Sequence, residues 1–230
     1  MKRHLWGLVA AVVTTGPVAA QQSGPVVIAV LPFEDRGSYG QDKEVFRALE
    51  LGIPATLAVE LGRHPRVRVA DRGRISQAVQ AQHLGPNARV DATTAAKVGS
   101  EAGAQYAITG NFADFYGKFR IDARVVDVKS GQILKVVSNS EPNLQDRADL
   151  SRIIQSLAEK ALAAVNLPAA GNAAATTGAG TVPTDALTQY SLGLLYESEG
   201  NKTKAGEHYQ RALTTFPDYP AAREGMQRVR

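Results

Sequence analysis

Two adjacent carboxylates, Glu34 and Asp35, are the strongest candidates for acid–base chemistry in this 230-residue sequence. They follow the apolar run VVIAVLPF at residues 26–33, and ligands of open α/β sheets usually bind where strands end. One carboxylate could act as an acid and the other as a base. No nucleophile or electrophile accompanies them, so a solvated pair in a turn is the more ordinary interpretation.

No other pattern in the sequence points to catalysis, a metal or a cofactor. The histidines, which we expect at the surface, lie in four different segments, and there is no cysteine to complete a zinc site: they are His4, His64, His83 and His208. Glycine-rich phosphate loops and the G-x-S-x-G nucleophile motif are absent from the sequence. We therefore expect no metal, no cofactor and no enzymatic activity, with an exported enzyme using Glu34 and Asp35 as an alternative.

A cluster of arginines is the one basic patch in the sequence. It comprises Arg63, Arg66, Arg68, Arg72 and Arg74. Such a patch could contact nucleic acid, anionic lipid or an acidic protein face. Alternation in the RVRV segment also explains two of these arginines as the solvated face of a strand. No aromatic residues are interleaved, and export argues against nucleic acid.

Residues 1–20 have the pattern of a secretory signal peptide. A basic start is followed by an apolar run, Leu5 to Val13, and by small residues ending at Ala20. The mature chain is then expected in the periplasm, free or associated with the outer membrane, without a transmembrane segment. The absence of cysteine excludes disulfides and a lipidated cysteine. The formal charge of +4 includes Lys2 and Arg3 of this leader, so it says little about nucleic acid.

Residues 25–166 alternate strand and helix signals. Strands are expected at 26–33, 66–71 and 105–112 and as a hairpin over 118–138 that turns at Ser130-Gly131. A first helix is expected around 46–61, although Gly52 and Pro54 should kink or split it. Further helices are expected from Asp71 to a stop at Leu84-Gly85, from Asp91 to Gly103, and over 150–165. This order, β-α-β-α-α-β-β-β-α, predicts an α/β domain with a mixed sheet covered by helices.

Within the hairpin, side chains should alternate between two faces. Apolar residues 119, 121, 123 and 125 belong to one face and the charged residues Lys118, Arg120, Asp122 and Arg124 to the other. Ile133 to Val137 could form an edge strand available for pairing, which leaves a homo-oligomer open. The neighbouring aromatics, Phe112, Phe115, Tyr116 and Phe119, are expected in the core or at strand edges.

Residues 167–184 separate a second, smaller unit at 185–230. The segment is rich in alanine, glycine and threonine and has almost no large apolar residue, so we expect a flexible linker. The unit after it shows the pattern of a small all-α helical hairpin with a polar third helix.

The first unit resembles the CsgG family, the curli secretion channel, whose periplasmic domain is related to the amino-terminal domain of TolB. The resemblance covers residues 26–165 and rests on VVIAVLPFED, VRVADRGRI, GAQYAITGNF and IDARVVDVKSGQIL. It implies a role at the outer membrane, as a secretion channel or a periplasmic accessory module. Channel members carry a lipidated cysteine and long membrane hairpins, whereas this chain has no cysteine and short connections at Tyr116-Gly117 and Lys129–Gln132.

The second unit resembles a single tetratricopeptide repeat with a capping helix. The matching positions are Leu192, Gly193, Tyr196, Gly200, Ala205, Tyr209, Ala212 and Pro217, while Gln189 stands where the repeat usually has tryptophan. One repeat is below the roughly three that bury a continuous core, so its exposed face needs a partner. That partner could be the first unit, another copy or a different protein.

The two resemblances together imply a non-enzymatic accessory or scaffold protein of an envelope assembly or secretion system. Its partners would be envelope proteins, and nucleic acid is not expected. The way the repeat family binds peptides implies contacts at Leu187, Tyr190, Leu194 and Glu197. An outer-membrane pore subunit is the alternative.

Overall fold

The protein is described by a computed structural model over residues 24–40, 42–82, 90–139, 144–168 and 181–230. The predicted signal peptide, the predicted stop at Leu84-Gly85, and the histidines His4 and His83 lie outside these residues. Residues 169–180 of the predicted linker also lie outside them. The division of the chain at this linker therefore stays a prediction.

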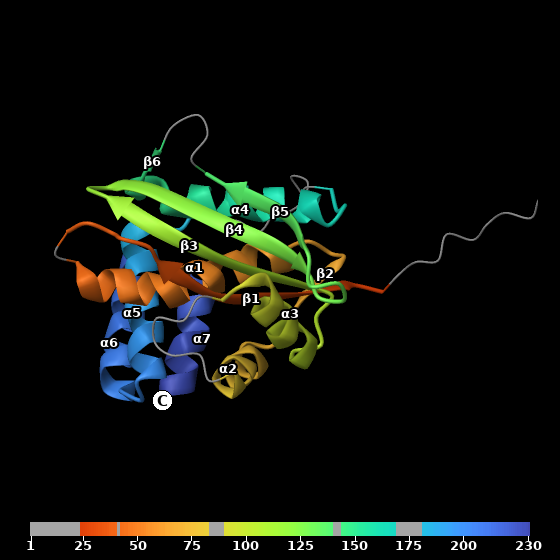
Figure 1. Ribbon diagram of the computed structural model, residues 1–230. Coiled ribbons are helices and arrows are strands. Elements are labelled where there is room, and N and C mark those ends of the chain that lie inside the picture. Colours follow the sequence, from red (N-terminus) through yellow and green to blue (C-terminus); the bar gives the residue numbers. More distant parts are fainter. Residues whose placement is uncertain (1–23, 41, 83–89, 140–143, 169–180) are drawn as a thin grey trace, which may run out of the picture.

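A mixed sheet forms the centre of the fold (Figure 1). Its strands are β1 (Val26–Asp35), β2 (Val67–Val69), β3 (Tyr106–Phe115), β4 (Lys118–Asp127), β5 (Ile133–Ser138) and β6 (Gln145–Asp146). The spatial order is β2-β1-β3-β4-β5, and β6 pairs with β4 beyond the end of β5. The pairs of β1 with β2 and with β3 are parallel, and those of β4 are antiparallel. The predicted α/β class with a mixed sheet is confirmed.

The predicted alternation along β4 is also confirmed. Phe119, Ile121 and Val125 are fully buried in the core, while Lys118 and Arg120 are exposed. We call the side of the sheet that carries Lys118, Arg120, Asp122 and Arg124 the outer face of β4. Its polar side chains follow from the period of two residues in a strand.

The first four helices cover the sheet. They are α1 (Lys43–Gly62), α2 (Arg72–Ala81), α3 (Ala92–Glu101) and α4 (Leu150–Ala164), with a short 3₁₀ turn, η1 (Arg147–Asp149), before α4. Two predicted caps are confirmed: Asp71 accepts a hydrogen bond from the main-chain N–H of Arg74 at 2.9 Å, and Asp91 accepts one from Thr94 at 2.7 Å.

Gly52 and Pro54 were expected to kink or split the first helix, and the split is wrong, because α1 runs unbroken for 20 residues. Pro54 removes one main-chain hydrogen bond. Burial of the neighbouring side chains Ile53 and Leu57, both fully inaccessible, holds the helix against the sheet and outweighs that loss.

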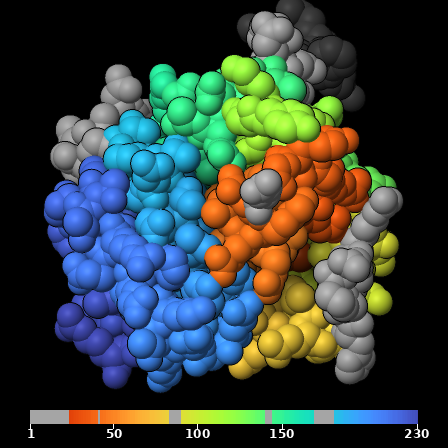
Figure 2. All heavy atoms as spheres, turned by 90° about the vertical axis from the view of Figure 1, so that its left-hand side faces the viewer, coloured from red at the N-terminus to blue at the C-terminus, as the bar shows by residue number. Residues whose placement is uncertain are grey.

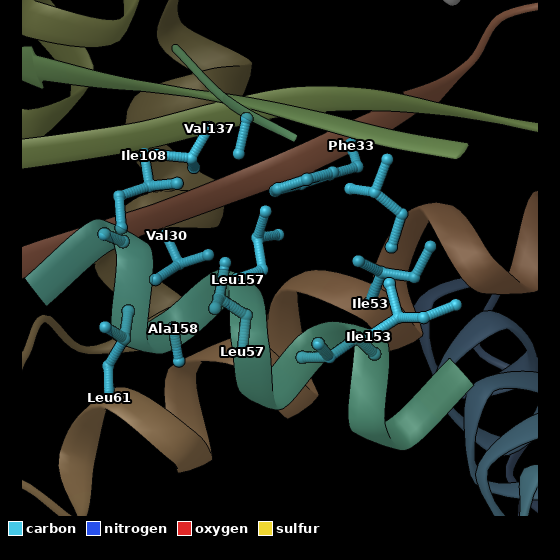
Figure 3. Packing of buried hydrophobic residues seen from close by; sticks show 14 of the residues in the cluster. Val30, Phe33, Ile53, Leu57, Leu61, Ile108, Val137, Ile153, Leu157 and Ala158 are labelled. Carbon is cyan, nitrogen blue, oxygen red and sulfur yellow. The ribbon is translucent and has the colours of Figure 1, made fainter. Parts of the chain in front are cut away.

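The main core lies between the sheet and the pair α1 and α4. Figure 3 shows Ile53 and Leu57 of α1 and Leu157 of α4 gathered beneath Val30 and Phe33 of β1. A second, smaller core of mostly small side chains lies on the other side of the sheet, where α2 and α3 cover β1. The second core reaches the outer face of β4 at Val126, where α3 contacts the strand, whereas Lys118 and Arg120 nearer the start of β4 stay exposed.

Three further helices end the chain: α5 (Thr184–Ser198), α6 (Lys202–Thr215) and α7 (Pro220–Val229). They lie side by side next to α1 (Figure 1). The contact is close, since an added Cβ at Gly52 of α1 would be 1.8 Å from Oγ of Ser191 in α5. Leu187 of α5 is fully buried and belongs to the main core. The three helices therefore pack on the sheet domain of the same chain.

Candidate partner-binding surface

The carboxylates that sequence analysis singled out are hydrogen-bonded to neighbouring loops. Asp35 Oδ1 accepts from the main-chain N–H of Ser38 at 3.0 Å and from its hydroxyl at 2.6 Å. Glu34 Oε1 accepts from the N–H of Val90 at 2.9 Å, and its other oxygen lies 3.3 Å from Arg36. Both side chains thus fix the chain that follows the end of β1.

Two of the four histidines, His64 and His208, lie among the described residues. Among the described residues, no group of three or more potential ligands could hold a metal ion. His64 is buried, contrary to expectation, and its Nδ1 accepts from the N–H of Arg66 at 3.1 Å. His208 is half-buried and stacks on Tyr196 with ring centroids 5.3 Å apart.

The residues predicted to bind a peptide lie mostly inside the molecule. Leu187, Tyr190 and Leu194 are buried, and Tyr190 lines a cavity of about 390 Å³ between α1, α5 and α7. Leu187 and Leu194 are thus inaccessible to a partner in this arrangement, whereas Tyr190 faces the cavity. The prediction that they bind a partner is not tested by this arrangement.

Glu197, the fourth of these residues, is held by Arg228 of α7. Arg228 Nε and Nη2 donate to the two carboxylate oxygens at 2.8 and 3.0 Å, and the hydroxyl of Tyr209 also donates to Glu197. Burial raises the pKa of Glu197, but the hydrogen bonds from Arg228 and Tyr209 outweigh burial and lower the pKa below its ordinary value.

The positions assigned to helix packing are partly brought together. Tyr209 lies between Gly193 and Gly225, where an added Cβ would be 2.4 and 2.6 Å from its ring, so both glycines leave room for the ring. Gly225 and the α1 contact of Ser191 were missed, because small residues carry no sequence signal of what they face. Of the remaining positions, Ala205 and Ala212 are buried and Leu192 packs on α1. The hydroxyl of Tyr196 donates a hydrogen bond to Glu44 of α1. Gly200 has a φ of 77°, and Pro217 is exposed.

Exposed apolar side chains gather instead at the β3–β4 hairpin. Tyr39, Phe115 and Tyr116 form what we call the aromatic tip. The ring of Tyr39 lies 5.9 Å from that of Phe115 and 5.8 Å from that of Tyr116, and Tyr116 is 83% exposed. Phe112, in contrast, is buried as expected. Figure 2 shows the hairpin, in yellow-green, lying directly beside the segment between β1 and α1, in orange.

The aromatic tip is fixed by a buried aspartate beneath it. Asp114 is 1% exposed, and its Oδ1 accepts from the N–H of Gly117 at 2.6 Å. Its main-chain groups pair with the β1–α1 segment, donating to Ser38 Oγ at 2.9 Å and accepting from the N–H of Tyr39 at 2.8 Å. Arg147 Nη1 lies 2.9 Å from Asp114 Oδ2, an ion pair without hydrogen-bond geometry. The main chain that carries the three rings is therefore fixed before any partner arrives.

Tyr116 has a backbone conformation that its residue type disfavours. Its φ is 55° and that of Gly117 is 87°, so both residues of the two-residue hairpin turn are left-handed. This conformation costs an L-residue other than glycine about 1–2 kcal/mol. Asparagine or glycine would be the usual choice here, and a tyrosine in a strained turn is a reason to look for function.

The edge strand β5 carries a second group of exposed apolar side chains, Ile133, Leu134 and Val136. Val136 is 57% exposed and pairs with Arg124, whereas Phe115 pairs with Lys118. Cross-strand partners share a face, and Lys118 and Arg124 are on the outer face of β4. The aromatic tip and the exposed side chains of β5 thus border the same side of the sheet, next to the part of β4 that α2 and α3 leave exposed.

The outer face of β4 between these groups is polar, and two of its three basic side chains have ion pairs. Arg120 Nε lies 2.8 Å from Asp122 Oδ2, and Lys118 Nζ lies 3.4 Å from Asp146 Oδ2. The surface therefore offers another protein both exposed apolar side chains and hydrogen-bonding groups, which protein interfaces combine. None of the helices in the described part of the chain is long and apolar enough to cross a bilayer.

Comparison with known proteins gives similarities to solved structures only. No protein-family model and no curated protein sequence matches the chain. The similar structures include the LpoB C-terminal domain from Salmonella enterica, at 18% identity over 53% of this chain and 85% of that one, with a TM-score of 0.38. They also include E. coli LpoB, at 16% identity over 60% and 78%, with a TM-score of 0.42. TolB from Acinetobacter baumannii is 17% identical over 71% of this chain and 30% of its own, with a TM-score of 0.36. At these scores the likenesses carry no argument about function.

These findings overturn the resemblances drawn from the sequence. The expectation of a CsgG-family domain followed by a tetratricopeptide repeat is wrong, since no family model matches either part of the chain. Short strings such as VVIAVLPFED describe a buried strand and its turn, which many α/β proteins share. The curli-secretion role and the pore alternative rested on that resemblance and are withdrawn.

Proposed function

We propose that this chain is an exported, non-enzymatic accessory protein of the cell envelope that binds a protein partner through the aromatic tip and the outer face of β4. The envelope location is supported by the predicted signal peptide. The absence of catalysis is supported by the hydrogen bonds of Glu34 and Asp35, which engage these carboxylates with the protein's own loops.

The observation that carries the proposal is the preorganised aromatic tip. Two tyrosines and a phenylalanine are exposed, and each would gain on burial a part of the about 1.5–3 kcal/mol that a fully exposed large apolar side chain gains. A buried aspartate and a buried serine hydroxyl hold the segments that carry them. Rigid exposed aromatic side chains are the residues that most often dominate protein–protein binding energy.

Site-specific photo-crosslinking tests this proposal. A benzophenone amino acid placed at Tyr116 or at Val136 should form an adduct with the same envelope protein, because both positions border one surface. Val59, an exposed apolar residue of α1 outside both groups, is the matched control position and should give no such adduct.

A second change, at Tyr39, tests whether the two crosslinking positions belong to one surface. The adduct from position 136 should disappear when Tyr39 is changed to serine, since that change removes a ring from the far border of the same surface. An adduct with twice the chain's own mass would identify the partner as a second copy. Equal labelling from all three positions, or none from Tyr116 and Val136, would refute the proposed surface.

A further inference from the structure

A groove lies between α1 and α2, away from the outer face of β4. It encloses about 330 Å³, and its walls are mostly apolar, with Leu51, Ala55 and Ala58 from α1 and Ile75 and Val79 from α2. The small side chains of α1 leave the space open, since alanine at two positions cannot reach α2. A volume at the lower end of the ~300–1,000 Å³ typical of small-molecule pockets suits one slender ligand.

One charged residue also lines this groove. Arg72 is the first residue of α2 and is exposed. It has no ion pair with any carboxylate in the described part of the chain. Glu197, whose pKa Arg72 helps to lower, already has both carboxylate oxygens bound by Arg228. A guanidinium beside apolar walls thus remains able to bind an incoming anion.

The arginines around Arg72 are unusual within this protein. Arg66, Arg68 and Arg74 are likewise exposed and without an ion pair among the described residues. Elsewhere most arginines have a carboxylate within 4.0 Å, including Arg47, which lies 2.7 Å from Glu199. The local excess of positive charge is therefore specific to this edge of the molecule.

The position of two of these charges is unfavourable for the helix itself. Arg72 and Arg74 lie in the first turn of α2, where the one carboxylate is that of the N-cap Asp71, already engaged by the N–H of Arg74 at 2.9 Å. The amino-terminal end of a helix carries partial positive charge, so cations there destabilise it slightly while anions are attracted. Arg72 opposes the helix, has no ion pair among the described residues and borders an apolar groove, so it suits an anion that carries a hydrocarbon chain.

We infer that the groove between α1 and α2 binds a single-chain anionic amphiphile, with its chain between the helices and its headgroup against Arg72. The ligand class is an alkyl phosphate or carboxylate of one chain, because the volume is too small for a two-chain lipid. This site is separate from the surface proposed for the protein partner. The four arginines supply attraction at longer range, and Arg72 supplies the direct contact.

Calorimetric titration of the whole purified chain with alkyl phosphates tests the inference. Decyl phosphate, kept below its micelle concentration, should bind once per chain and about fifteenfold more tightly than octyl phosphate, since each buried methylene strengthens binding about fourfold. Inorganic phosphate should show no saturable binding. Decyltrimethylammonium, with the same chain and the opposite charge, should also fail to saturate.

Two matched variants test whether Arg72 is the arginine that contacts the headgroup. Arg72→Gln should weaken decyl phosphate binding about tenfold, as expected for loss of a charged hydrogen bond. Arg74→Gln removes the same charge from the same helical turn but does not line the groove, so its effect should stay within about twofold. Ala58→Leu should block the chain, and the two arginine variants decide the question even if this variant does not fold.

Three results would overturn the inference. Equal loss in Arg72→Gln and Arg74→Gln would show a diffuse charge effect rather than a site. Phosphate binding as tight as that of the octyl ester would show a headgroup site without a chain. Equal binding of the cationic amphiphile would show apolar adsorption only.

Discussion

Replacing Gly52 with alanine tests the central packing contact, that of α5 against α1. The added carbon would lie 1.8 Å from Oγ and 2.5 Å from Cβ of Ser191, well inside any real contact distance. Rotation of the serine hydroxyl cannot relieve the second clash, because Cβ is fixed by the backbone of α5. One helix must therefore move away from the other.

The size of the effect follows from two opposing terms. Overpacking a close contact costs about 1–3 kcal/mol, and the fixed Cβ clash places this change at the upper end. Alanine in place of glycine inside a helix contributes about 1 kcal/mol in the other direction. We expect the free energy of unfolding to fall by about 2 kcal/mol in Gly52→Ala.

Urea denaturation followed by circular dichroism measures this change. Gly206→Ala is the matched control, because its added carbon would lie 3.7 Å from Val229 Cγ2, an ordinary contact in another helix, and it should be more stable by up to about 1 kcal/mol. Ser191→Gly combined with Gly52→Ala should recover the overpacking loss. If Gly52→Ala were as stable as Gly206→Ala, the packing of α5 on α1 would be wrong.

Further outcomes follow from single side chains. Asn139→Ala should lower the free energy of unfolding by about 2 kcal/mol in chemical denaturation, because its buried amide pairs an N–H and a C=O of β4 that would otherwise be unpaired; a loss under about 0.5 kcal/mol would contradict this. Arg228→Ala should reduce thermal stability at pH 7. Because the folded state lowers the pKa of Glu197, that stabilisation is present above its ordinary value of 4.5 and is lost as the pH falls further, so the two melting curves should converge toward pH 3. Tyr116→Asn should raise thermal stability slightly by relieving the left-handed turn while abolishing the crosslink at position 136, and a clear fall in the melting temperature would mean that stacking on Tyr39 outweighs the strain.

The strands and caps could be predicted from the sequence because their causes are local. Alternation of side chains fixed the two faces of β4, and Asp71 and Asp91 marked the starts of α2 and α3 before any packing was known. The same patterns could not distinguish one α/β family from another. Short apolar strings followed by polar turns recur wherever a strand is buried.

The aromatic tip could be predicted only in part, because its arrangement depends on contacts between residues far apart in the sequence. Phe115 and Tyr116 were noticed, but they were grouped with buried neighbours of the same residue type. Their exposure depends on Ser38 and Asp114, which are 76 residues apart and pair through a buried hydrogen bond. Tyr39 joins them only through that pairing, so no local pattern could reveal it.

Burial of Leu187 in the main core has a consequence for how the molecule assembles. The interior of the sheet domain stays incomplete until residues far along the chain have been made, since α1 and its neighbour α5 are separated by more than a hundred positions. Long-range contacts of this kind delay folding until both partners are present. A chain truncated before α5 would expose an apolar surface on α1. We therefore expect the nascent chain to complete its folding only after its last helices have left the ribosome.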